Sequence, residues 1–222
     1  MIRFRKNTAS GLRAMGVAAL LLVASTPAPA SAAPAGSPSA SASTDLQQAV
    51  GALRAIASLR ADFTQTDNAG QRVTGVLSLK RGGKIRFQYA PGYPMVIVAD
   101  GHALTLLDTE LRQMQRWPIA NSPLGALLDP TRDVTRFGTV LPGFEAGTLG
   151  IEVRDRTHPE YGAITLIFRH RPSAPGGLEL DGWVSADAQN RRTSIHLANH
   201  RYGVALDDAQ FRLTNPLAGP HH

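Results

Sequence analysis

Two runs of the 222-residue sequence set its architecture: Leu77-Ser-Leu-Lys-Arg-Gly-Gly-Lys-Ile-Arg-Phe-Gln-Tyr89 and Met95-Val-Ile-Val-Ala-Asp-Gly-His102. Apolar residues recur at every second position in the first run, and Gly82-Gly83 and Asp100-Gly101 supply turns. This alternation is typical of antiparallel strands with one apolar and one polar face. Such a sheet must place its apolar face against something, so the nature of that cover bears directly on function.

Related patterns extend over most of the chain. They predict about eleven strands, at residues 62–66, 73–80, 84–89, 95–99, 103–108, 112–117, 149–155, 163–169, 178–184, 192–198 and 209–213. Residues 45–59 have apolar side chains at helical spacing, with Thr44 or Asp45 as N-cap. Ser122 and Pro123 favour a short helix over residues 122–128, and residues 130–137 are a candidate for a second. So many strands are best accommodated in a barrel or half-barrel, with the inserted helices at its mouth or inside the curve.

The first 32 residues have the features of a secretory signal peptide. A basic start precedes a short apolar run over residues 15–23, and Ala30-Ser31-Ala32 offers a cleavage site. The apolar run is too short to span a membrane. Residues 33–44, almost wholly Ala, Pro, Ser and Gly, are expected to form a disordered leader. Residues 45–216 would then be one folded domain, and residues 217–222 a tail.

Charge and cysteine content exclude several classes of protein. The chain has 23 basic and 17 acidic residues, but four of the basic ones precede Ala33, which leaves a net charge of +2. No basic run interleaved with aromatic residues follows, so we expect no nucleic-acid binding. The chain has no cysteine. This excludes thiol catalysis, cysteine metal sites and a lipid anchor on a cysteine, and predicts a soluble exported protein.

A search for catalytic chemistry finds no motif. His196 and His200 are four residues apart, but no carboxylate cluster nearby supplies the third ligand of a catalytic zinc, so we expect no metal site. Candidates for paired carboxylates exist by count only: Glu145, Glu152, Asp155 and Glu160. There is no Gly-x-Ser-x-Gly elbow, phosphate-binding loop or dinucleotide glycine pattern. We therefore expect no enzymatic activity and no cofactor; a hydrolase with two scattered carboxylates is the alternative from the enzyme class.

The largest set of candidate functional residues is apolar. On a strongly curved sheet, alternation would place these residues on the inner face: Phe63, Leu77, Leu79, Ile85, Phe87, Met95, Ile97, Ile151, Val153, Leu166 and Phe168. An ordinary core closed by helices would use the same residues. The pattern therefore leaves two interpretations open, a filled core or a loosely filled cavity that admits an apolar ligand.

Several segments, in their order along the chain, resemble the LolA family of outer-membrane lipoprotein carriers. They are Leu59-Arg-Ala-Asp-Phe-Thr-Gln-Thr66, Gly75-Val-Leu-Ser-Leu-Lys-Arg81, Lys84-Ile-Arg-Phe-Gln-Tyr89, Val98-Ala-Asp-Gly101, Ser122-Pro-Leu-Gly-Ala-Leu-Leu128 and residues 180–193, followed by Asn199 and Phe211. The match covers nearly all of residues 45–216. It implies an α+β, mainly β fold: an unclosed antiparallel β-barrel of about eleven strands, with an N-terminal helix and inserted lid helices over an apolar cavity.

The resemblance also implies a function. Such proteins are periplasmic carriers that take acylated lipoproteins from an inner-membrane ABC transporter and deliver them to an outer-membrane lipoprotein receptor. We expect this chain to do the same as a monomer. The inner-face residues would form the lipid-binding cavity, and Leu124, Leu127 and Leu128 would belong to the lid. The alternative on the same fold is a protein that binds or senses another lipid.

Two positions depart from the family's pattern. The family has Lys-Arg-Pro at the hairpin where this chain has Lys80-Arg81-Gly82, and its arginine hydrogen-bonds the closed lid. Arg81 would take that role, or it would be an ordinary exposed hairpin arginine. Asn190 stands where close relatives have glycine, and asparagine tolerates the left-handed conformation that this turn requires.

Overall fold

The computed structural model describes residues 38–119, 137–141 and 145–213. Several predicted segments lie outside these ranges: the signal peptide, the start of the leader, the helix at residues 122–128, most of the helix at residues 130–137, and the tail. The division of the chain into those segments therefore stays a prediction. No helix of the described residues is long and apolar enough to cross a membrane.

Eleven strands form one antiparallel sheet in the order β6-β5-β4-β3-β2-β1-β11-β10-β9-β8-β7. The strands are β1 (Ser58–Thr66), β2 (Arg72–Lys80), β3 (Lys84–Tyr89), β4 (Met95–Asp100), β5 (Ala103–Asp108), β6 (Gln113–Pro118), β7 (Gly138–Leu141), β8 (Thr148–Arg154), β9 (Ala163–His170), β10 (Leu178–Ala186) and β11 (Arg192–Tyr202). β6 and β7 are its two edges and do not pair with each other. The predicted fold class, an unclosed mainly β barrel, is confirmed.

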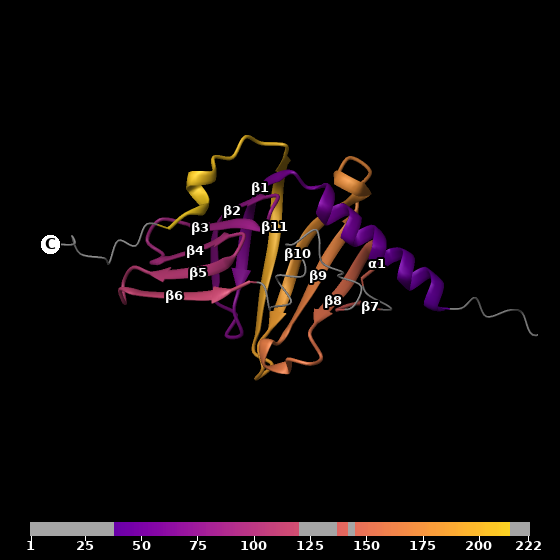
Figure 1. Cartoon of the computed structure of the whole chain (residues 1–222), viewed down its shortest axis with the longest axis horizontal. Coiled ribbons are helices and arrows are strands. Elements are labelled where there is room, and N and C mark those ends of the chain that lie inside the picture. Colours follow the sequence, from indigo (N-terminus) through magenta and orange to yellow (C-terminus); the bar gives the residue numbers. More distant parts are fainter. Residues whose placement is uncertain (1–37, 120–136, 142–144, 214–222) are drawn as a thin grey trace, which may run out of the picture. The chain divides into compact units, whose positions relative to one another are not determined.

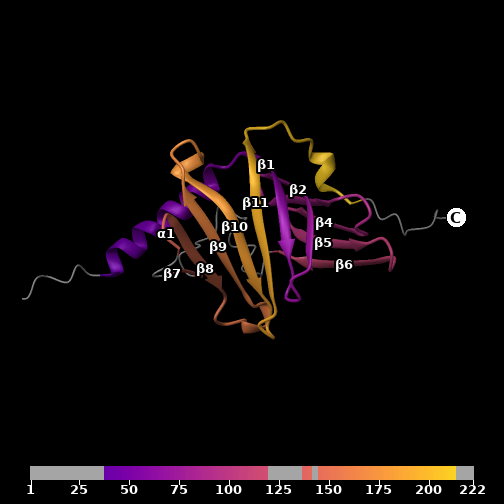
Figure 2. The same ribbon diagram turned by 180° about the vertical axis from the view of Figure 1, so that it is seen from behind.

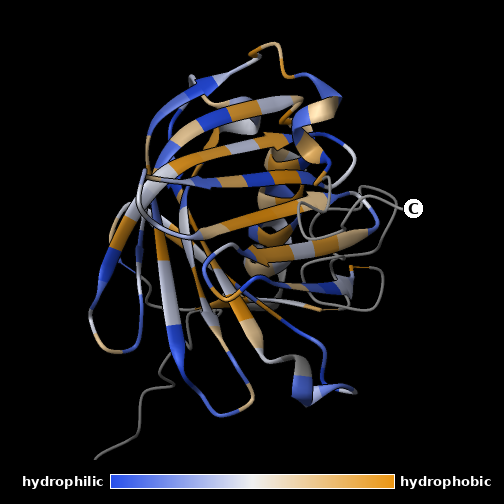
Figure 3. Ribbon diagram, turned by 90° about the vertical axis from the view of Figure 1, so that its left-hand side faces the viewer, coloured by the Kyte–Doolittle hydropathy of each residue, from blue (hydrophilic) through white to orange (hydrophobic). Residues whose placement is uncertain are grey.

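The sheet bends between two meanders. β2–β6 follow one another as hairpin neighbours, as do β7–β11, and the pairing of β1 with β11 joins the two sets. Figure 1 shows β3–β6 running across the direction of β8–β11, and Figure 2 shows the same bend from behind. Polar and apolar residues alternate along many of the strands (Figure 3), so each strand contributes to an inner and an outer face.

The helix α1 (Pro38–Ala55) lies across β7, β8 and β10 and packs on the short helix η3 (Pro175–Gly177). Gly176 makes this contact possible, because a Cβ there would lie 2.7 Å from the Cα of Ala52, and its φ is +67°. The helix starts seven residues before the expected Asp45, so residues 38–44 of the expected leader are helical. Pro38 at the first position of the helix is compatible with this start, because a proline there loses no intrahelical hydrogen bond. The helix also ends at Ala55, and Leu59, expected at its end, belongs to β1.

Two strand predictions need correction. The strand expected at residues 209–213 is wrong, since residues Asp208–Phe211 form the 3₁₀ helix η4, whose N-cap Asp207 accepts a hydrogen bond from the Ala209 backbone N–H. Conversely, β7 was not predicted, because its four residues, Gly-Thr-Val-Leu, are too few to show alternation. The count of eleven strands is right only because these two errors cancel.

Residues 203–213, which we term the C-terminal strap, cover the outer face of β2–β4. Leu206 and Phe211 form a small apolar cluster with Val98, partly flanked by Val96, Val204 and Leu213. Polar contacts fix the strap along its length. The Ser58 hydroxyl donates to the Val204 carbonyl over 2.7 Å, and Arg86 donates to the Gln210 carbonyl over 3.0 Å. The strap therefore backs this part of the sheet from outside.

Candidate functional site

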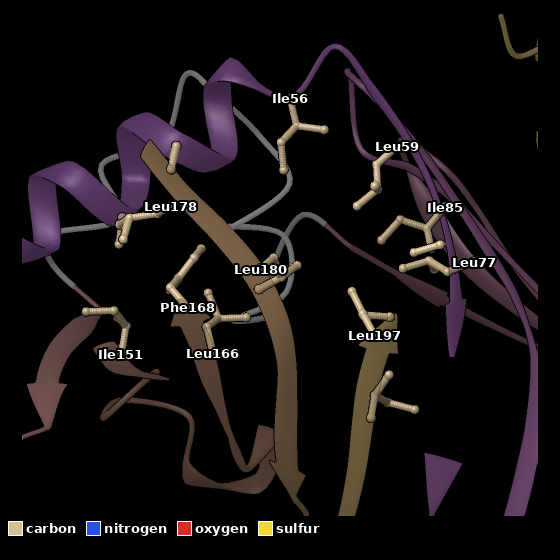
Figure 4. Close-up of a cluster of buried hydrophobic side chains, with 14 of the residues drawn as sticks. Ile56, Leu59, Leu77, Ile85, Ile151, Leu166, Phe168, Leu178, Leu180 and Leu197 are labelled. Carbon is tan, nitrogen blue, oxygen red and sulfur yellow. The ribbon is translucent and has the colours of Figure 1, made fainter. Parts of the chain in front are cut away.

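The predicted cavity residues all join one apolar cluster on the inner face. Seven of the ten are buried, and Leu79, Met95 and Ile97 are partly buried against them. In Figure 4, side chains from β1–β3 and from β8–β11 point toward a common space beside α1. Val153, the eleventh residue of the predicted inner face, is also buried in this cluster. The sequence thus placed these side chains on the correct face, while their role in lipid binding stays a prediction.

Burial within this cluster is uneven. Under α1, Phe168, Val153 and Ile151 are between 0% and 2% exposed. On the other side of the bend, exposure rises toward the edge strand. The register places Ile85, Ala99, Leu104 and Trp117 in one row across β3–β6. Ile85 and Ala99 are 7% and 0% exposed, Leu104 is partly buried, and Trp117 is 45% exposed. The inner face of β4–β6 is therefore a partly accessible apolar surface that continues into the buried cluster.

Sequence reasoning missed part of this surface. Leu104 and Leu106 on β5 and Trp117 on β6 share the inner face by register with residues that were predicted. The alternation of Leu104 and Leu106 was visible in the sequence and could have identified them. The prediction also named no residue of β10, although Leu178 and Leu180 are buried in the cluster and Trp183 meets Phe87. A register shift between Leu180 and Gly182 places Trp183 on the same face as Leu180.

Aromatic side chains mark the bend between the two sides. Phe63 meets Phe87 and Tyr89 edge to face, with ring centroids 5.3 and 5.1 Å apart, and Phe87 meets Trp183 in the same way at 5.9 Å. The Tyr89 hydroxyl donates to Gln65 Oε1 over 2.8 Å. Burial, together with nearby Tyr93, raises the pKa of Tyr89 to about 12. Tyr89 is therefore neutral at physiological pH and adds no charge to this apolar face.

Arg81 lies at the end of α1. Its guanidinium Nη2 donates to the carbonyl of Arg54 over 3.3 Å, and its backbone N–H donates to the carbonyl of Ala57 over 3.0 Å. Arg54 is in the last turn of α1, where a cation near unpaired carbonyls is favourable. The predicted lid residues Leu124, Leu127 and Leu128 lie outside the described residues, so the contact expected between Arg81 and the lid is untested.

The two histidines considered as metal ligands contact other groups, and two of the candidate carboxylates have lowered pKa values. His200 Nε2 donates to the Leu180 carbonyl over 2.8 Å, and His196 lies 3.9 Å from Asp181. The described residues contain no group of three His, Cys, Asp or Glu suited to a metal ion. Hydrogen bonds from Thr157 lower the pKa of Asp155, and a backbone hydrogen bond lowers that of Glu160. Both shifts run opposite to what a general acid requires.

Asn190 has the left-handed conformation predicted for it, with φ of 59°. It lies in the β10–β11 hairpin, where Asp187 accepts hydrogen bonds from the Gln189 and Arg191 backbone N–H groups. The substitution for glycine is therefore accommodated.

Comparison with known proteins identifies relatives along most of the chain. The family model described as outer membrane lipoprotein carrier protein LolA matches residues 54–214, a range that includes all eleven strands. An outer-membrane lipoprotein carrier protein of Chromobacterium violaceum is 29% identical over 170 residues, covering 71% of this chain and 77% of the relative. One of Methylococcus capsulatus is 29% identical over 167 residues, with the same coverage. A solved LolA superfamily protein of Nitrosomonas europaea has 11% identity and a TM-score of 0.46, covering 78% of this chain and 97% of that chain.

Proposed function

This chain belongs to the LolA family of outer membrane lipoprotein carrier proteins, and from that premise we propose that it carries acylated lipoproteins across the periplasm, without a catalytic step. Its source of cargo would be an inner-membrane ABC transporter, and its destination an outer-membrane lipoprotein receptor. The observation that carries the proposal is the accessible apolar inner face of β4–β6, continuous with the cluster under α1.

The energetics of an acyl chain support this role. Burial of a methylene gains about 0.8 kcal/mol, so one sixteen-carbon chain gains about 12 kcal/mol gross on leaving water. A lipoprotein with several such chains therefore needs a shielded passage through an aqueous compartment. A carrier must also release its cargo, and a surface that is only partly enclosed lowers the cost of release compared with a sealed core.

Depletion of the protein in its native host would test the proposal directly. Lipoproteins destined for the outer membrane should then accumulate in the inner membrane, as measured by membrane fractionation. Mass spectrometry of the lipid bound to the purified mature protein supplies the second measurement. If only phospholipid is recovered and lipoproteins are sorted normally after depletion, the cargo is another lipid and the proposal is wrong.

Arg81 can be tested at the same time. Since its guanidinium contacts the end of α1 at the rim of the apolar cluster, the Arg81→Leu variant should hold lipoprotein but release it slowly to acceptor membranes. Arg60→Leu, at an exposed position of β1, is the matched control and should behave as wild type. Normal transfer by Arg81→Leu would reduce Arg81 to an ordinary hairpin arginine.

A further inference from the structure

A second concavity lies at the hairpin end of the sheet. It has a volume of about 570 Å³, and we term it the hairpin cleft. Three segments line it: the β1–β2 turn (residues 67–69), the start of β9 (residues 163–164) and the β10–β11 hairpin (residues 185–187 and 191–193). This volume falls within the range of roughly 300–1,000 Å³ that is usual for ligand pockets.

The cleft adjoins the apolar inner face. Ile164, in its lining, packs against the main apolar cluster and pairs with Ser185 of β10, which also lines the cleft. Trp183 lies two residues along the same face of β10, and its ring meets Phe87 at the bend of the sheet. A ligand in the cleft would therefore have an apolar path beside it, leading through Trp183 toward the exposed inner face of β4–β6.

The lining of the cleft is mixed polar and apolar, and its charged residues are equal in number of each sign. Its residues include two aspartates, Asp67 and Asp187, and two arginines, Arg191 and Arg192. Asp67 accepts the backbone N–H groups of its own turn, Ala69 and Gln71, over 2.8 and 2.9 Å. Asp187 is bound by Arg191, with Nε donating to Oδ2 over 2.7 Å. Both carboxylates are thus already engaged, and the lining has no excess of positive charge that would select an anionic ligand such as a phosphate.

The lining offers hydrogen-bond donors for a ligand. Within the described part of the chain, the hydroxyl of Thr193, which shares a face of the sheet with Ser185, makes no hydrogen bond. Ser185 donates to the Thr193 carbonyl over a long 3.3 Å. Donors of this kind, in a site of zero net charge, match the carbonyl oxygens of a neutral ligand.

We propose that the hairpin cleft binds the neutral, carbonyl-rich peptide segment next to the acyl chains of a lipopeptide, while the chains extend past Trp183 onto the inner face. This assignment rests on the proposed function and names the part of the cargo that the apolar face leaves unbound. The acyl chains supply affinity, and the cleft distinguishes a lipidated peptide from a free fatty acid.

Two probes with the same acyl chain test the proposal: an N-hexadecanoyl tetrapeptide amide of neutral residues, and hexadecanoic acid. Wild type should bind the acyl-peptide about tenfold more tightly, the effect of one or two net hydrogen bonds. Thr193→Trp fills the cleft and should remove that preference while leaving the affinity for hexadecanoic acid unchanged. Ser194→Trp places the same side chain on the opposite face of β11 and should keep the preference.

The outcomes separate the two proposals. Equal affinity of wild type for both probes, or an unchanged preference in Thr193→Trp, would overturn the role of the cleft and leave the acyl carrier intact. Failure of wild type to bind either probe would overturn the carrier function itself. If Thr193→Trp does not fold, the amide chemical shifts of wild type provide the test. Those of Ser185, Ala186 and Thr193 should change on binding of the acyl-peptide and not on binding of hexadecanoic acid. Unchanged shifts with the acyl-peptide would refute peptide binding in the hairpin cleft.

Discussion

Ile151 on β8 and Ile97 on β4 belong to the same apolar cluster of the sheet, yet Ile151 is 2% exposed and Ile97 is only partly buried. α1 packs on β7, β8 and β10, and removes that side of the inner face from water. Over the inner face of β4–β6, the described residues place no helix. We call these regions the covered side (β7–β10) and the open side (β4–β6).

The difference separates two tasks that one apolar face would otherwise share. Burial of apolar area contributes about 25 cal/mol per Å² to folding, so the covered side holds the fold together. Area that is exposed in the free protein contributes less to folding and can contribute to ligand binding instead. A carrier needs both, because cargo that occupied the folding core could leave only at the cost of unfolding it.

The largest expected effect comes from replacing one isoleucine by alanine on each side and comparing the two variants. Ile151→Ala should lower the free energy of unfolding by about 3–4 kcal/mol, because it leaves a cavity in a closed core. Ile97→Ala should cost only about 1 kcal/mol, since its side chain is already partly exposed. Urea unfolding measures both values. For acyl-chain affinity the order should reverse, with Ile97→Ala weakening binding more. An equal decrease in the free energy of unfolding in both variants would contradict the distinction between the covered and the open side.

Substitutions at two neighbouring glycines test how α1 packs against the covered side. Gly176→Ala should destabilise the protein by about 2–3 kcal/mol, from a left-handed φ and a clash with Ala52. Gly177 has a φ of +76°, but no atom lies within 4 Å of a Cβ added there. Gly177→Ala should therefore lower the free energy of unfolding only by the conformational cost of about 1 kcal/mol. Hydrogen exchange of α1 should rise more in the first variant than in the second. Equal exchange would mean that this contact does not hold the helix.

On the open side, Trp117→Ala should weaken acyl-chain binding several-fold and change the free energy of unfolding by less than about 0.5 kcal/mol. Trp117 is 45% exposed and lies on the inner face. Met114→Ala is the control, because Met114 is similarly exposed at 41% but pairs with Leu107, in the row that faces outward. A loss of binding that is equal in both variants would place the ligand elsewhere.

The smallest effect concerns the C-terminal strap behind the sheet. Hydrogen bonds from Lys80 and Lys84 lower the pKa of Asp208 from 3.8 to about 2. A depressed folded-state pKa gives stability that is present above pH 3.8 and is lost as the pH falls toward 2. Over that window, wild type should lose slightly more stability than Asp208→Asn, as followed by acid unfolding. Parallel curves would show that this ion pair does not secure the strap.

Much of the architecture was predictable because alternation is a local property. β3 and β5 were placed with their observed bounds, and the predicted inner-face residues do share one cluster. The errors fall where local pattern carries little information. Ala209–Leu213 alternates, yet its residues turn into η4 because Phe211 is drawn into the cluster with Val98 and Asp207 caps the turn. The inward position of Trp183 could not be read from alternation, because a register shift after Leu180 reverses which residues of β10 face inward.

The sequence by itself was enough to predict an export signal and to indicate the family, since both depend on the order of residues along the chain. It also determined the mainly β fold and the apolar face of each strand, since these follow from a period of two. Only the tertiary structure decided which part of that face is buried. The partial burial of Leu104 and Leu106, the exposure of Trp117 and the burial of Ile151 and Phe168 depend on where α1 docks. That position is fixed by contacts such as Gly176 against Ala52, between residues more than 120 positions apart in the chain.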